Sequence, residues 1–311
     1  MEYLLTTNNL SKHYCNWSNG LRLQKAVQHV NMHVKKGDIY GLIGRNGAGK
    51  TTILRMISGL AKPTEGDVCL FGYPGKDAGK LQHRIGALIE APGVYADLSA
   101  YENLKLKCLA MGVRDMGAID EALEVVGLKH VVGKPVKNFS MGMKQRLGIA
   151  LALIGNPDLV ILDEPINGLD PQGIVEIREI IEVLNREHGI TFIISSHILE
   201  ELSKIATSYG ILHGGMLLQE LSKEELLEKC NEHMKVRTDN TKKTCTILEE
   251  MGITNYKVLE SEEIQIYERL DDSGEIARRL ADADIKIREI AVKREALEDY
   301  YLSLTGGGTN V

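Results

Sequence analysis

Runs of consecutive apolar residues recur along residues 1–221 and alternate with amphipathic helical segments. Apolar residues at successive positions indicate strands buried on both faces, as in a parallel sheet. The runs that predict such strands are Ile39–Ile43, Val68–Phe71, Ile85–Ile89, Leu159–Leu162 and Thr191–Ile194. The helical segments lie near residues 100–111, 141–155, 172–187, 197–206 and 222–230. This alternation predicts an α/β fold with a mostly parallel sheet.

Shorter runs predict an antiparallel β edge beside that sheet. Tyr3–Thr7 and Ala26–Val30 have the pattern of antiparallel edge strands. Tyr209–His213 and Met216–Gln219 flank Gly214-Gly215, which predicts a hairpin because glycine accepts the backbone angles of a tight turn.

The pattern changes near residue 221. Beyond it, a βαββαβ order suits a small α+β module of the ferredoxin-like type. The expected elements are a strand at 234–238, a helix at 241–251, strands at 255–259 and 264–269, a helix at 273–283, a strand at 285–292 and a closing helix at 294–304. We therefore expect two domains, over residues 1–221 and 222–311.

Charge supports this boundary and narrows the function. Of the 311 residues, 43% are hydrophobic and 26% charged, and the net charge is −6. Residues 1–221 carry 23 basic and 23 acidic side chains, whereas residues 222–311 carry 14 and 20. Neither part is basic, which argues against nucleic acid as a partner. The five cysteines are scattered without a Cys-x-x-Cys pair, which is typical of reduced thiols rather than disulfides or zinc ligands.

The sequence contains no apolar run of the roughly 18–20 residues that a membrane helix needs. Its first residues lack the basic start and apolar core of a signal peptide. Any role at a membrane is therefore expected to depend on a partner.

The segment Gly44-Arg45-Asn46-Gly47-Ala48-Gly49-Lys50-Thr51-Thr52 lies between the strand run Ile39–Ile43 and the helix formers Ile53–Ile57. A strand, a glycine-rich loop and a helix in this order form a phosphate-binding loop. Glycines let backbone N–H groups approach phosphate oxygens, and the helix start adds a positive dipole end. Lys50 is expected to reach the β- and γ-phosphates and Thr51 to bind Mg²⁺. The predicted binding residues are Gly44, Asn46, Gly47, Ala48, Gly49, Lys50, Thr51 and Thr52.

An acidic pair, Asp163-Glu164, directly follows the apolar run Leu159–Leu162. A strand would deliver Asp163 to its carboxyl end, where ligands bind in such sheets. Adjacent acids are unfavourable there unless a cation is close. We expect Asp163 to hold Mg²⁺ and Glu164 to polarise an attacking water as general base.

Ser140 precedes the predicted helix 141–155 as its expected N-cap, within Phe139-Ser140-Met141-Gly142-Met143. Together with the two preceding motifs, this segment resembles the ATP-binding subunit of ABC transporters, whose usual sequence here is Leu-Ser-Gly-Gly-Gln. The resemblance implies a P-loop ABC ATPase cassette with a helical subdomain over about residues 91–156, and ATP and Mg²⁺ as cofactors. It also implies that Ser140 and Gly142 contact the γ-phosphate held by the other subunit of a dimer.

Further segments match the family in order. Gly168-Leu169-Asp170-Pro171 resembles the loop that links the two sites of the dimer. His197, after Ile194-Ser195-Ser196, is implied to contact the γ-phosphate. The implied catalytic set is Glu164, His197 and Lys50.

Two positions leave alternatives open. Glu90 stands where the family usually has glutamine, at the end of a strand. A carboxylate there can ligate Mg²⁺ more strongly than an amide, or Glu90 is simply a solvated residue at the strand end. Tyr14, in a segment that resembles the family's aromatic loop, offers a ring to the adenine base, with Trp17 or neither residue as alternatives.

The resemblance implies a partner and a location. Only one cassette is present, and no coiled-coil heptads separate the phosphate loop from Asp163, so a transporter subunit is expected. Its partners would be an integral-membrane permease and a second copy or a related ATPase chain. The protein would be cytoplasmic and peripheral on the inner face of the cell membrane through the permease. Apolar residues within 90–106 either meet a permease helix or pack into the core.

Several segments resemble the bacterial bacitracin- and lantibiotic-resistance exporters in particular. They are Leu88-Ile89-Glu90-Ala91-Pro92-Gly93, Phe139–Arg146 and the C-terminal Leu297-Glu298-Asp299-Tyr300-Tyr301. The implied cargo is a membrane-active peptide antibiotic. The alternatives are a transporter for a lipid, ion or polysaccharide, and a soluble ATP-dependent dimerisation switch. A P-loop kinase or nucleic-acid ATPase is disfavoured by the ordered serine and histidine motifs.

Overall fold

The structure is a computed structural model that describes residues 3–16, 22–229, 232–259, 263–294 and 297–305. The chain divides into two compact units, Met1–Lys223 and Glu224–Val311. Each unit has its own sheet and its own apolar core.

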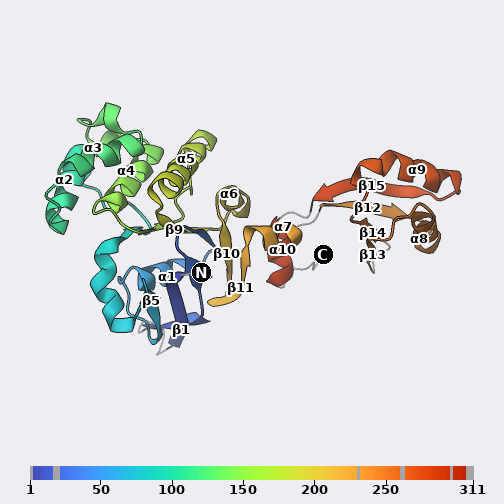
Figure 1. The fold of residues 1–311 in the computed structure, drawn as a ribbon, viewed down its shortest axis with the longest axis horizontal. Coiled ribbons are helices and arrows are strands. Elements are labelled where there is room, and N and C mark those ends of the chain that lie inside the picture. Colours follow the sequence, from blue (N-terminus) through green and yellow to red (C-terminus); the bar gives the residue numbers. More distant parts are fainter. Residues whose placement is uncertain (1–2, 17–21, 230–231, 260–262, 295–296, 306–311) are drawn as a thin grey trace. The chain divides into compact units, whose positions relative to one another are not determined.

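A six-stranded sheet in the order β11-β10-β4-β9-β8-β7 organises the first unit (Figure 1). Its strands pair in parallel except β11, which is antiparallel to β10. Every residue of β4, β8 and β9 is buried, as their continuous apolar runs predict. The bounds are β4 Ile39–Ile43, β7 Ile85–Leu88, β8 Leu159–Asp163, β9 Thr191–Ser196, β10 Ser208–His213 and β11 Met216–Ser222. The predicted α/β fold is confirmed.

A second, antiparallel sheet has the order β2-β1-β5-β6, and β3 also pairs with β1. Its strands are β1 Tyr3–Asn16, β2 Arg22–Val30, β3 His33–Lys35, β5 Glu65–Leu70 and β6 Tyr73–Pro74. Two predictions are wrong here. Val68–Leu70 belongs to this antiparallel sheet rather than to the parallel one, since β5 pairs antiparallel with β1. Only alternate residues of these three are buried, as expected for a strand with one face toward the core. Tyr3–Thr7 is not an edge strand, since this part of β1 pairs with both β3 and β5.

Helices cover these sheets, and α2, α3 and α4 gather in a helical region of their own within the first unit (Figure 1). The α-helices of this unit are α1 Lys50–Ile57, α2 Ala100–Met111, α3 Gly117–Val125, α4 Met141–Leu153, α5 Pro171–His188 and α6 Leu199–Ser203, whereas α7 Lys223–Lys229 belongs to the second unit from Glu224 onward. The 3₁₀ segments of the first unit are η2 Gly75–Arg84, η3 Lys129–Val131 and η4 Val136–Asn138.

Side-chain caps fix where several of these helices begin. Ser99 and Glu102 form a reciprocal capping box at α2, and Ser140 accepts a bond from the Met143 N–H at α4. Asp170 caps α5, with Pro171 at its first position. The loop that follows Glu164 therefore ends in a fixed helix start.

The second unit has a four-stranded antiparallel sheet in the order β13-β14-β12-β15. Its elements are β12 Glu232–Thr238, α8 Thr241–Glu250, β13 Tyr256–Val258, β14 Glu263–Ile266, η5 Leu270–Asp272, α9 Ser273–Asp282, β15 Ile287–Arg294 and α10 Leu297–Leu304. Met234, Val236, Ile264 and Ile266 are buried on one face of this sheet, in a core with residues of α8 and α9. This sequence of elements is a split βαβ arrangement.

Candidate functional site

The glycine-rich segment 44–49 forms the loop between β4 and α1. Gly47 and Gly49 have φ angles of 82° and 107°, a region that side-chain-bearing residues rarely adopt. A Cβ atom on Gly49 would also lie 2.6 Å from the carbonyl oxygen of Ala26. Both the backbone conformation and the close approach of β2 therefore require glycine at this position.

This loop lines a cavity of about 530 Å³. Tyr14, Lys25, Glu164 and Gly215 contribute to the lining from other parts of the unit. All predicted phosphate-loop residues line the cavity except Gly44, whose carbonyl oxygen accepts a hydrogen bond from Lys50 Nζ at 2.6 Å. The size fits a small-molecule ligand, and the loop's N–H groups and Lys50 suit phosphate.

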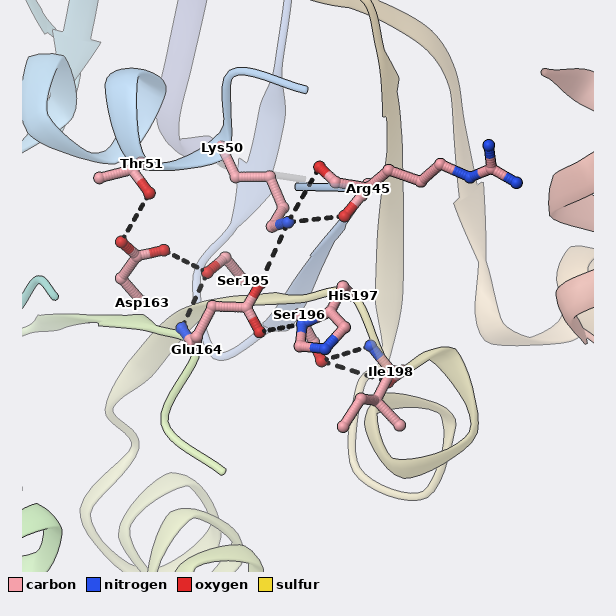
Figure 2. A network of polar contacts seen from close by, with 10 residues as sticks. Arg45, Lys50, Thr51, Asp163, Glu164, Ser195, Ser196, His197 and Ile198 are labelled. Atoms are coloured by element: carbon pink, nitrogen blue, oxygen red, sulfur yellow. Dashed lines mark hydrogen bonds and ion pairs between the residues drawn. The ribbon is translucent and has the colours of Figure 1, made fainter. Parts of the chain in front are cut away.

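Lys50 is 5% exposed, and its Nζ contacts three groups: it donates to the carbonyl oxygens of Gly44 and Arg45, at 2.6 and 3.4 Å, and it pairs with the Glu164 carboxylate. The Nζ atom lies 3.0 Å from Glu164 Oε1 (Figure 2). The geometry between these two atoms is not that of a hydrogen bond, and no other donor among the described residues reaches this buried oxygen. A buried carboxylate oxygen without a donor is a place where a water molecule can be bound and polarised.

Asp163 ends β8 and is 3% exposed. Thr51 Oγ1 donates to its Oδ2 at 2.8 Å, and Ser195 Oγ donates to its Oδ1 at 2.5 Å. The Ser195 hydroxyl also accepts a bond of 2.9 Å from the Glu164 N–H. Ser195 thus fixes both acids, a role that the sequence analysis missed.

Thr51 and Asp163 together present oxygen ligands at the loop. Mg²⁺ prefers oxygen ligands and is usually bound through one or two side chains plus substrate phosphates and waters. Among the described residues no group of three or more His, Cys, Asp or Glu side chains could hold a metal. This donor set therefore fits Mg²⁺ bound with a nucleotide rather than a metal held by the protein alone.

Glu164 has a φ of 49°, in the left-handed region, directly after the strand. Such a conformation is unfavourable for a glutamate and is often retained at functional sites. Its Oε2 lies 2.7 Å from His197 Nδ1 (Figure 2). The predicted catalytic residues Lys50, Glu164 and His197 therefore form one connected group.

Other predicted residues lie elsewhere. Ser140 and Gly142 at the start of α4 are not among the residues that line the cavity. Glu90 is also absent from the lining, and its Oε1 accepts a bond of 2.6 Å from Arg55 Nη2. The sequence analysis left a Mg²⁺ ligand and a solvated residue as alternatives for Glu90, and it did not foresee the contact with Arg55.

Tyr14 lines the cavity from β1, so the segment predicted to resemble an aromatic loop is a strand here. Tyr14 pairs with Gln24 in the β1–β2 register, and the Lys12 ammonium lies 5.2 Å from the Tyr14 ring centroid. Trp17, the alternative partner for adenine, lies outside the described residues.

A second cavity of about 370 Å³ lies between β7, α2 and α4. Its lining is mostly apolar and includes Pro92, Tyr95, Leu106 and Leu151. Of the apolar residues predicted within 90–106, Tyr95 is 64% exposed whereas Leu104 is fully buried. Some apolar residues of this segment are therefore exposed at the surface, and others pack into the core.

In the described part of the chain, no helix is both long and apolar enough to span a membrane.

Comparisons with known proteins agree with this geometry. The ABC transporter family matches residues 27–167. The bacitracin transport ATP-binding protein BcrA of Bacillus licheniformis is 42% identical over 311 residues, covering 99% of both chains. The lantibiotic transport ATP-binding protein SrtF of Streptococcus pyogenes is 45% identical over 218 residues, which are 70% of this chain and 90% of that one.

Solved structures extend the similarity to the fold. The dimeric ATP-binding cassette MJ0796, in a post-hydrolysis state with ADP and Pi, superposes with a TM-score of 0.64. It is 26% identical and covers 70% of this chain and 98% of its own. The chain belongs to the family of ABC transporter ATP-binding proteins.

Proposed function

We propose that the chain is the ATP-hydrolysing subunit of an exporter that removes a peptide antibiotic of the bacitracin or lantibiotic type. Membership of the ABC family makes it an ATPase coupled to transport. The observation that carries the hydrolytic role is the connected group Lys50, Glu164 and His197 beside the phosphate loop. The cargo rests on the relatives that transport bacitracin and lantibiotics.

In this proposal the loop amides and Lys50 bind the β- and γ-phosphates of ATP. Thr51 and Asp163 would hold Mg²⁺, which supplies positive charge to the phosphate oxygens. Glu164 takes a proton from the attacking water, and its strained backbone and the Ser195 hydroxyl keep it in place. His197 orients the second oxygen of Glu164 and would contact the γ-phosphate. Tyr14 offers its ring to the adenine base.

Two surface features of the first unit, an exposed helix start and an apolar cavity, support the proposed partners. Ser140 is an exposed helix cap outside the nucleotide cavity, where it would serve the nucleotide of a second copy or a related chain. The apolar cavity beside Tyr95 and Leu106 would receive a short helix of the permease. Through that permease the protein would lie at the cytoplasmic face of the membrane. We propose residues 222–311 as a separate, ferredoxin-like accessory domain.

Glu164→Gln tests the hydrolytic role. The amide cannot accept the proton, so we expect ATP turnover to fall by about 10²–10⁴-fold while ATP still binds. The variant should accumulate as an ATP-bound dimer in size-exclusion chromatography with light scattering. Glu187→Gln, on an exposed part of α5, is the matched control and should keep wild-type turnover.

Unchanged ATP turnover in Glu164→Gln would contradict the assignment of Glu164 as the general base.

The cargo needs a separate measurement. Cells that express the chain with its permease should survive higher bacitracin or lantibiotic concentrations, and cells with Glu164→Gln should not. Equal sensitivity of both strains to both peptide classes would contradict the cargo and leave the ATPase assignment standing.

A further inference from the structure

Helix α1 supplies a partner to acidic residues at the carboxyl ends of β7 and β8. One of these contacts joins two proposed catalytic residues, the second joins the two residues proposed to hold Mg²⁺, and the third involves Arg55, to which no role has been given so far. The contacts are Lys50 Nζ with Glu164 Oε1 at 3.0 Å, Thr51 Oγ1 with Asp163 Oδ2 at 2.8 Å, and Arg55 Nη2 with Glu90 Oε1 at 2.6 Å.

The position of Arg55 follows from helix geometry. Residues four apart lie on the same face of a helix, so Arg55 shares a face of α1 with Thr51. Glu90 follows β7, whose Leu88 pairs with Leu162 of β8, the residue before Asp163. Both acids therefore leave neighbouring strands at the same edge of the sheet, and both meet the same face of α1.

The backbone fixes one side of the ion pair. Glu90 has a φ of 65°, in the left-handed region that a glutamate adopts only when its surroundings determine it. The Arg55 and Glu90 side chains are 38% and 62% exposed, so ions and water reach both. An exposed ion pair is weak, and a divalent cation can displace the arginine from the carboxylate.

We propose that Arg55 is a positioning residue that holds the Glu90 carboxylate in the nucleotide-free protein and yields it when Mg-ATP binds. The inference rests on the proposed ATPase function. Arg55 then competes with Mg²⁺ for Glu90 and sets the Mg²⁺ concentration that nucleotide binding requires. A glutamine at position 90 carries no charge, so it would remove this competition.

The alternative is an ion pair that only stabilises the fold, and the chain offers a matched control for it. Arg84 and Asp158 precede β7 and β8 at the opposite ends of the same two strands. Arg84 Nε lies 2.7 Å from Asp158 Oδ2, with both side chains 36% exposed. Arg84 also lies 3.9 Å from the Phe71 ring centroid, so Arg84→Ala should reduce stability at least as much as Arg55→Ala but leave the Mg²⁺ requirement unchanged.

The test is a double-mutant cycle of wild type, Arg55→Ala, Glu90→Gln and the double variant. Mg²⁺ is titrated at fixed concentration of a fluorescent ATP analogue, and binding and turnover are both followed. Arg55→Ala should lower the half-saturating Mg²⁺ concentration about two- to fivefold, as expected for removal of an exposed charged competitor. In the Glu90→Gln background the same change should have no effect.

Thermal unfolding provides a readout that does not depend on turnover. Without nucleotide, the two single changes should be non-additive, because the pair is formed; with saturating Mg-ATP they should become additive. Equal Mg²⁺ requirements in all four proteins, or additive unfolding in both conditions, would overturn the inference alone. A wild type that binds no Mg-ATP would overturn the proposed function and this inference with it.

Discussion

A lysine in each unit of the molecule is largely buried beside glutamate, yet the two lysines have different surroundings. In the first unit Lys50 lies 3.0 Å from one carboxylate, that of Glu164, and opens into a cavity of about 530 Å³. In the second unit Lys235, with 16% of its side chain exposed, lies 2.9 Å from Glu263 and 3.3 Å from Glu289.

The charge balance differs accordingly. The Glu263 carboxylate, which accepts a hydrogen bond from Lys235, is the main cause of a raised lysine pKa, with Glu289 adding to it. Hydrogen bonds from Lys293 and then Lys235 lower the pKa of Glu289. Lys235 is thus matched by carboxylates on both neighbouring strands, and an added phosphate would meet repulsion from them.

At Lys50, by contrast, the neighbouring groups are those of a glycine-rich loop and the N-terminus of α1, where backbone N–H groups and the helix dipole favour an anion. We therefore expect Lys50, which is accompanied by space and by backbone donors, to be the lysine of the two that binds an anion. A lysine enclosed by cross-strand carboxylates stabilises a sheet instead.

The largest effect that separates the two lysines is expected from Lys50→Ala. Loss of a charged hydrogen bond to the phosphates should weaken ATP binding by about 10- to 100-fold, measured by titration with a fluorescent analogue. Lys62→Ala, at an exposed position in the same unit, is the control. If Lys50→Ala bound ATP as tightly as the control, the phosphate site could not be where we place it.

A smaller effect, on turnover rather than binding, is expected from Ser195→Ala. The hydroxyl bonds both Asp163 and the Glu164 N–H, and groups that orient metal ligands and bases in this way typically contribute about 10–100-fold. Steady-state kinetics should show this loss in kcat with ATP affinity within about twofold of wild type.

The matched control is the neighbouring Ser196→Ala. Its hydroxyl contacts only the Ile198 backbone among the contacts described for it, so its loss should be smaller. An equal loss in both variants would indicate a general disturbance of β9 rather than a specific role of Ser195.

Sequence patterns predicted the parts of the first unit that local chemistry determines. Continuous apolar runs such as Leu159–Leu162 become fully buried strands, and the glycine-rich loop lies between a strand and a helix as expected. Here the pattern and the fold have the same cause, because both faces of a parallel strand must be apolar.

The patterns were less informative where contacts between distant residues decide. Val68–Leu70 is too short to distinguish alternating from continuous burial, so its sheet was assigned wrongly. The Arg55–Glu90 ion pair joins residues 35 apart, and no local signal marks it. Helix α3 was missed although Ile119, Ala122, Leu123 and Val126 are buried at helical spacing, a signal that was present in the sequence.

The smallest effect is expected from Lys235→Met, which changes the lysine of the second unit instead of Lys50. Methionine keeps much of the apolar stem but leaves Glu263 and Glu289 without their shared cation, so unfolding at pH 7 should become easier by under about 1 kcal/mol. Because hydrogen bonds from Lys293 and Lys235 lower the folded-state pKa of Glu289, its contribution to stability is present at neutral pH and is lost as the pH falls through that lowered pKa. Urea unfolding followed by circular dichroism should therefore show a difference from wild type that shrinks in acid. Lys242→Met, on the exposed side of α8, is the charge-matched control.

The ATP affinity of Lys235→Met should stay within about twofold of wild type. A loss of affinity comparable to that of Lys50→Ala would show that the two lysines do not differ as their surroundings indicate.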